Sequence, residues 1–107
     1  AAGCDFFSGY PITPASEIYA EMMRRLPDRG GRAVGAPDEI SALSYAVGAS
    51  LTGSRAMTAT SGPGWSLMIE TVQYALMTET PVVIAVSQRL GPANFAHARA
   101  ATGISAT

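Results

Sequence analysis

Three short segments hold the residues whose types and spacing could do chemistry, and each is predicted to lie where a strand is followed by a helix. In chain order they are Gly9-Tyr10-Pro11-Ile12-Thr13-Pro14, Asp38-Glu39 and Thr60-Ser61-Gly62-Pro63-Gly64. The glycines of the third segment let a backbone approach a ligand while free N–H groups face it. The ends of strands are also where parallel α/β domains bind ligands, so the three segments predict a binding site.

Two of these segments also have a purely structural interpretation. Pro11 restricts Tyr10 to extended geometry, and Thr13 is expected to cap the next helix with Pro14 at its first position. The glycine segment matches neither a Walker loop nor the dinucleotide fingerprint, and it can serve as a tight turn between a strand and a helix. From the residues alone, both interpretations stay open.

Two acidic residues open the second predicted helix. Asp38 fits the role of an exposed first-turn carboxylate that the helix dipole favours. Glu39, one residue further round the helix, can instead turn toward the carboxyl edge of the sheet. Thr13 and Ser61 are expected to converge at the same edge.

The elements that must position these residues alternate along the chain. Strands are predicted at 4–8, 32–36, 55–60 and 81–87, and helices at 15–26, 38–51 and 65–77. The second helix has apolar residues at Ile40, Leu43, Val47 and Leu51, with small residues between them that indicate close packing. Alternating strands and helices predict an α/β fold with a parallel sheet flanked by helices and joined by right-handed crossovers.

Composition narrows the class of protein. The 107 residues predict one domain, and 48% hydrophobic and 14% charged residues with a net charge of −1 indicate neither a nucleic acid nor an anionic membrane as partner. No apolar run reaches the roughly 18 residues of a membrane span. The single cysteine, Cys4, excludes an internal disulfide and fits a reducing cytoplasm. Because the chain starts at Ala1 without methionine, we expect a truncated or excised domain.

Taken together, the three segments closely resemble the pyrimidine-binding domain of the alpha subunits of 2-oxoacid:ferredoxin (flavodoxin) oxidoreductases. The resemblance covers residues 3–92 and includes the flanking Ala15-Ser16-Glu17-Ile18, Ile40-Ser41-Ala42-Leu43 and Ala56-Met57-Thr58-Ala59. It implies the thiamine diphosphate-binding fold, in incomplete form. It also implies a partial pyrimidine-binding domain at 1–92, followed at 93–107 by a divergent loop or disordered end.

The resemblance implies roles for individual residues. Glu39 would share a proton with ring nitrogen N1′ of thiamine diphosphate and favour the imino tautomer, whose nitrogen removes the thiazolium C2 proton. Thr13 matches a residue near the substrate carbonyl. Arg89 matches one that holds the substrate carboxylate, for which a guanidinium offers two parallel donors. The implied cofactor-binding residues are Tyr10, Pro11, Glu39, Ser61, Gly62 and Pro63.

Other family features are missing or changed. Pro37 and Leu90 depart from the family pattern, and the chain has neither a Gly-Asp-Gly segment with a downstream asparagine nor a set of cysteines. The resemblance therefore implies that a beta subunit or another domain supplies the diphosphate site, Mg²⁺ and the iron–sulfur clusters. No metal site is expected on this chain, and the isolated chain is expected to be inactive.

The resemblance predicts half of an active site in an oxidoreductase. That enzyme would convert a 2-oxoacid, such as pyruvate or 2-oxoglutarate, and coenzyme A to acyl-CoA and carbon dioxide while reducing ferredoxin. One alternative is the pyrimidine domain of a non-oxidative thiamine-dependent decarboxylase or synthase, against which Tyr10-Pro11-Ile12-Thr13-Pro14 argues. Another is a non-catalytic partner-binding module or truncated remnant.

Overall fold

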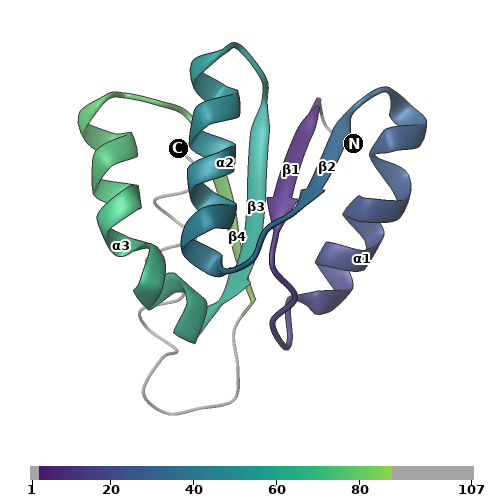
Figure 1. Cartoon of the computed structure of the whole chain (residues 1–107), viewed down its shortest axis with the longest axis horizontal. Coiled ribbons are helices and arrows are strands. Elements are labelled where there is room, and N and C mark those ends of the chain that lie inside the picture. Colours follow the sequence, from purple (N-terminus) through teal and green to yellow (C-terminus); the bar gives the residue numbers. More distant parts are fainter. Residues whose placement is uncertain (1–2, 88–107) are drawn as a thin grey trace.

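The computed structural model describes residues 3–87, in which four parallel strands form one sheet (Figure 1). The strands are β1 (Phe6–Gly9), β2 (Arg32–Gly35), β3 (Ala56–Ser61) and β4 (Val83–Ser87), in the order β2-β1-β3-β4. The helices are α1 (Ser16–Arg25), α2 (Glu39–Leu51) and α3 (Gly62–Met77), with a short 3₁₀ turn, η1 (Pro27–Arg29). The predicted parallel α/β fold is confirmed.

Each face of the sheet has its own apolar cluster. Phe7 pairs in register with Met57 and Ile84 with Thr58, so Phe7 and Ile84 lie on opposite faces. The Phe7 face packs against α1, whose Ile18, Tyr19 and Met22 cover it. The other face packs against residues of α2 and α3, namely Leu43, Val47, Met68 and Val72. The sheet is therefore the middle one of three layers.

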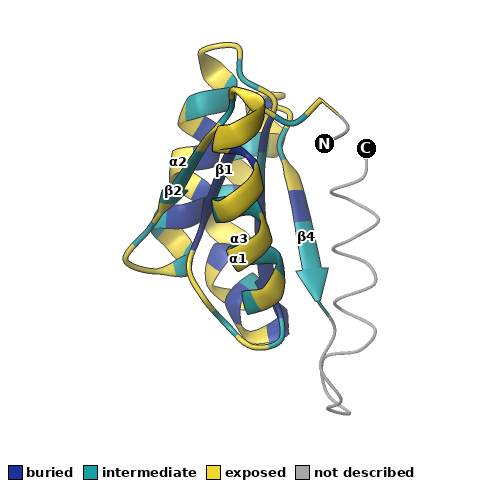
Figure 2. Ribbon diagram, turned by 90° about the vertical axis from the view of Figure 1, so that its right-hand side faces the viewer, coloured by how far each residue is buried: buried dark blue, intermediate teal, exposed yellow. Residues whose placement is uncertain are grey.

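The two helical layers are buried to different extents. No residue of α1 is buried, whereas α2 and α3 each bury one side, as the colouring in Figure 2 shows. Within residues 3–87, no helix combines the length and the apolarity that crossing a membrane requires.

The start of α1 differs from the prediction. Residues 13–15 form a turn, and α1 begins at Ser16 with Ala15 at its N-cap. The backbone N–H of Tyr19 donates to the carbonyl of Ala15 at 3.1 Å, so the helical hydrogen bonds start there. The expected capping by Thr13, with Pro14 at the first helical position, is therefore wrong. The Thr13–Pro14 peptide bond is cis.

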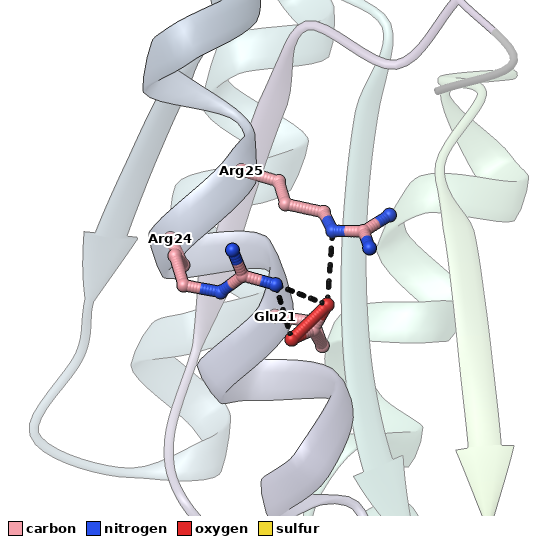
Figure 3. A network of polar contacts seen from close by, with 3 residues as sticks. All are labelled: Glu21, Arg24 and Arg25. Carbon is pink, nitrogen blue, oxygen red and sulfur yellow. Dashed lines mark hydrogen bonds and ion pairs between the residues drawn. The ribbon is translucent and has the colours of Figure 1, made fainter.

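The outer surface of α1 carries a small network of charges (Figure 3). Glu21 accepts from Arg24 at 2.9 Å and pairs with Arg25 at 2.9 Å, and all three side chains are exposed. The hydrogen bond from Arg24 lowers the pKa of Glu21 below its ordinary value. This network lies on α1, on the opposite side of the sheet from α2 and α3.

The buried side of helix α2 includes small residues and only part of its predicted apolar face. Ile40 and Leu51, expected to share the packed face, are exposed, while Ala42 and Ala46 are buried. Small side chains bring the helix close to the sheet, and Ser8 Oγ of β1 donates to the backbone carbonyl of Ala42. This hydrogen bond joins a side chain of the strand to a backbone carbonyl of the helix, and so it holds α2 at a short distance from the sheet.

Helix α3 begins three residues before its predicted start. Strand β3 ends at Ser61 and α3 starts at Gly62, so no loop separates them. Pro63 lies in the first turn, where its missing N–H has no intrahelical partner to lose. The interpretation of residues 60–64 as a glycine-rich turn is corrected accordingly: these residues are the end of a strand and the start of a helix.

Candidate functional site

The topology marks one edge of the sheet as the place for a ligand. In the order β2-β1-β3-β4, β2 lies on one side of β1, and β3 followed by β4 lies on the other. The direction in which strands are added therefore reverses between β1 and β3, and α1 and α2 lie on opposite faces of the sheet. Such a reversal opens a crevice outside the carboxyl ends of the two central strands. The residues at and just beyond the ends of β1 and β3 therefore flank the crevice. Ser61 is the last residue of β3, and Thr13 follows β1.

Glu39 opens α2 at this same edge, next to a separate capping residue. The Asp38 carboxylate accepts from the backbone N–H of Ser41 at 2.7 Å and so serves as the N-cap. Glu39 is half-buried, and none of the side-chain hydrogen bonds or ion pairs between the described residues involves its carboxylate. The division of roles expected from the sequence is confirmed for Asp38. The Glu39 carboxylate is left available for another partner.

The start of α2 touches the start of α3. A Cβ atom placed on Gly64 would lie 3.1 Å from Glu39 Cγ and 3.3 Å from Thr60 Cβ, and it would overlap Thr60 Oγ1. Gly64 is therefore the point where the side chain of Glu39, the end of β3 and the first turn of α3 meet. This contact brings Glu39 and the segment around Ser61 together, as the sequence predicted for the sheet edge.

Four hydroxyl side chains are buried within the two central strands, β1 and β3. Ser8, Thr58, Thr60 and Ser61 are all fully buried. Thr58 Oγ1 and Ser61 Oγ have no hydrogen-bond partner within the part of the chain that the structure describes. An unpaired buried hydroxyl costs free energy, so each such group in a native fold calls for a partner. Ser61 is the one at the N-cap of α3, beside the crevice.

The remaining predicted site residues are placed less closely. Tyr10 and Pro11 follow β1 and are exposed, and Thr13 lies in the exposed turn before α1. Gly62 is buried and Pro63 exposed in the first turn of α3. Arg89 lies outside the described residues, as does the segment 93–107.

Sequence reasoning missed two residues of this edge, Thr60 and Gly64. Both belong to the segment that the sequence singled out, but neither was assigned a role. A glycine at the third position of a helix, where a good helix former is expected, is the signal that could have drawn attention to Gly64. Among residues 3–87, no group of three His, Cys, Asp or Glu side chains could hold a metal ion.

Comparison with known proteins gives consistent matches. The family model described as pyruvate flavodoxin/ferredoxin oxidoreductase, thiamine diphosphate binding, matches residues 1–105. The 2-oxoglutarate synthase subunit KorA of Methanocaldococcus jannaschii is 55% identical over 91 residues, which are 85% of this chain and 25% of that protein. The ketoisovalerate oxidoreductase subunit VorB of Methanothermobacter marburgensis is 47% identical over 91 residues, or 26% of its length.

A solved structure is similar as well. It is the 2-oxoglutarate:ferredoxin oxidoreductase from Magnetococcus marinus with 2-oxoglutarate, coenzyme A and succinyl-CoA bound. The TM-score is 0.82 and the sequence identity 48%, over 85% of this chain and 16% of that chain. The chain thus spans about a quarter of the length of the curated relatives named above.

Proposed function

Because the chain belongs to the thiamine diphosphate-binding family of pyruvate flavodoxin/ferredoxin oxidoreductases, we propose that it forms the pyrimidine half of an active site in a 2-oxoacid:ferredoxin oxidoreductase alpha subunit. The whole enzyme would oxidise a 2-oxoacid, with coenzyme A and ferredoxin as the other substrates, in the cytoplasm. Identities of 55% and 59% to two KorA subunits, against 47% to VorB, favour 2-oxoglutarate as the 2-oxoacid. The names of these relatives favour an oxidative reaction over a non-oxidative decarboxylase or synthase.

One observation carries this proposal: a half-buried, uncommitted carboxylate, Glu39, lies against the first turn of α3 at the carboxyl edge of the sheet. An aminopyrimidine ring presents a nitrogen that can share a proton with a carboxylate. The Ser61 hydroxyl, at the N-cap of α3 on the same edge, has no partner among the described residues and can act as a donor. The residues present therefore fit a polar ring that carries hydrogen-bonding nitrogens.

In this proposal Glu39 holds a proton at the ring nitrogen N1′ and sets the protonation state of the bound pyrimidine. When bound, thiamine diphosphate supplies a nucleophilic carbon and accepts the electron pair released by decarboxylation. Ser61 and Gly62 would offer polar contacts from the start of α3. Tyr10 and Pro11 would flank the ring from the end of β1.

Substrate binding is assigned to two further residues. Thr13, in the turn after β1, would approach the 2-oxo group of the substrate from the same edge. Arg89 would hold the substrate carboxylate through its planar guanidinium, whose two parallel donors match a carboxylate. The assignment of Arg89 rests on the sequence motif alone.

The second half of the site would come from a partner. A beta subunit or another domain would hold the diphosphate, Mg²⁺ and the iron–sulfur clusters, and the isolated chain would be inactive. A sequence with one cysteine supports placing the clusters elsewhere, because cluster ligation requires several thiolates.

Replacement of the proposed proton-sharing group tests the function. In the assembled enzyme, Glu39→Gln should lower kcat by about 100-fold or more, the scale of a lost acid–base contribution, because an amide cannot share the proton. The thermal unfolding midpoint should change little, since the two side chains have the same shape. Steady-state kinetics at saturating cofactor checks this. A near-normal kcat would remove Glu39 from the mechanism and with it the proposed function of this edge.

A further inference from the structure

We propose that Gly64 and Thr60 are positioning residues that fix where the Glu39 side chain lies. This inference rests on the proposed function of Glu39 and adds two residues to it. Neither Gly64 nor Thr60 would touch substrate or cofactor in this role. They would act through Glu39. Gly64, which has no side chain, would leave space for the Cγ atom of Glu39, and the Thr60 side chain would fill the neighbouring space.

The contacts around Gly64 carry the inference. A Cβ atom at Gly64 would stand 3.1 Å from Glu39 Cγ, closer than ordinary van der Waals contact, and would overlap Thr60 Oγ1. The absence of a side chain at Gly64 is therefore what permits Glu39 and Thr60 to occupy their positions together. A methyl group at position 64 would press on Cγ and change the first torsions of the glutamate side chain, so its carboxylate would be moved.

The neighbours of Gly64 have little freedom to give way. Thr60 is fully buried and β-branched, so turning its hydroxyl aside also moves its methyl group within a packed interior. Helix α2 is held at its first turn by the Asp38 cap and by the hydrogen bond from Ser8 to the Ala42 carbonyl. A methyl group at position 64 must consequently displace the Thr60 hydroxyl, which it would overlap, and must also push the side chain of Glu39 aside rather than the helix that carries it.

Helix α2 supplies a matched control glycine. Gly48 lies on the same helix as Glu39, and a Cβ atom there would meet nothing within 4 Å. Gly48→Ala therefore makes the same chemical change as Gly64→Ala without a steric consequence. Any difference between the two variants reports on the contacts at position 64.

The experiment uses the assembled enzyme and two readouts. Gly64→Ala should lower kcat about 100-fold, the scale for a misplaced catalytic group, and Gly48→Ala should leave kcat unchanged. The second readout is the circular dichroism of the bound aminopyrimidine as a function of pH, which follows the balance between its tautomers. Gly64→Ala should shift the midpoint of that transition in the direction that Glu39→Gln shifts it, which a merely structural defect would not do.

Combined substitutions separate positioning from other effects. Adding Gly64→Ala to Glu39→Gln should change kcat less than about twofold, because residues that act as one unit are not additive. The double variant Thr60→Ala/Gly64→Ala should have a higher kcat than Gly64→Ala, because the new methyl group takes the place of the removed Oγ1. Its kcat should remain below that of Thr60→Ala alone. This double variant also keeps the test available if Gly64→Ala does not assemble.

The outcomes that overturn this inference differ from those that overturn the proposed function. Equal kcat values for Gly64→Ala and Gly48→Ala, or equal values for Thr60→Ala/Gly64→Ala and Thr60→Ala, would overturn the positioning role. A full loss from Gly64→Ala in the Glu39→Gln background would do the same. A large loss from Glu39→Gln in each of these cases leaves the proposed function standing.

Discussion

At the scale of single residues, two adjacent carboxylates at the start of α2 have different tasks. Asp38 is engaged by the backbone N–H of Ser41 at 2.7 Å, whereas Glu39 has no such bond among the described residues and lies against Gly64. The cap satisfies a backbone donor that the helix cannot satisfy itself. Because Asp38 does this, Glu39 can be used for chemistry without loss of the helix start.

Substitution of the cap tests this division. Asp38→Ala should lower the free energy of unfolding of the subunit by about 1 kcal/mol, the usual cost of a lost N-cap, while Asp38→Asn should lose much less because its amide oxygen still accepts. Urea denaturation of the two variants measures the difference. Equal losses for alanine and asparagine would show that the hydrogen bond to Ser41 is not what stabilises α2.

At the scale of helices and strands, the sequence predicted which elements exist better than where they begin. The order of four strands and three helices is correct because apolar strands and helical periods alternate clearly. The start of α3 and the capping of α1 were wrong for one reason: proline and glycine were interpreted as local signals. Pro63 lies inside the first turn of α3, and Pro14 lies in the turn before α1.

The site shows the same division between local and tertiary information. Glu39 could be found from its motif, and its common edge with Ser61 follows from parallel strands. The contact of Glu39 with Gly64 could not, because it depends on how closely α2 and α3 approach. The small residues of α2 indicated close packing, and Ala42 and Ala46 are buried, but the pattern did not say which element they pack against.

Gly48 in α2 and Gly53 just after α2 should change the free energy of unfolding in opposite directions when each is replaced by alanine. Gly48→Ala should raise the free energy of unfolding by about 0.5–1 kcal/mol, because it lies in the helix with open space around it. Gly53→Ala should lower it, because Gly53 ends the helix region with φ of +103°. Chemical denaturation distinguishes them, and a loss at both positions would contradict the open space at Gly48.

The charge network of α1 gives a stability contribution with a defined pH window. The pKa of Glu21 is lowered from 4.5 in the folded chain, so its contribution is present above that value and is lost as pH falls through the lower, folded pKa. Glu21→Gln should therefore unfold slightly more easily than wild type at neutral pH. The two melting temperatures should converge below pH 4.5. Since the group is exposed, added salt should also reduce the difference. A difference that grows in acid would reverse the assignment.

At the scale of the whole molecule, several large apolar side chains of the described residues are exposed. Leu67, Leu76, Met77 and Val83 are each at least half exposed. Residues of this kind are common on protein surfaces; these four lie on α3 and β4, and Leu51 at the end of α2 is exposed as well. The chain's own interior is accounted for by two clusters on either side of the sheet.

Cofactor binding should accordingly depend on a partner. Titration calorimetry of the chain alone with thiamine diphosphate and Mg²⁺ should show little heat, and binding should become tight when a beta subunit is added. The reason is that a diphosphate and its hard cation need oxygen ligands that this half of the site does not provide in the proposal. Tight, magnesium-dependent binding by the chain alone would contradict the division of the site.

The direct passage of β3 into α3 also limits how this protein can diversify. An α-helix has 3.6 residues per turn, so one residue inserted between Ser61 and Gly62 would rotate every later position of α3 by about 100°. Met68 and Val72 would leave the core, and Gly64 would turn away from Glu39. The junction therefore does not tolerate a change of length.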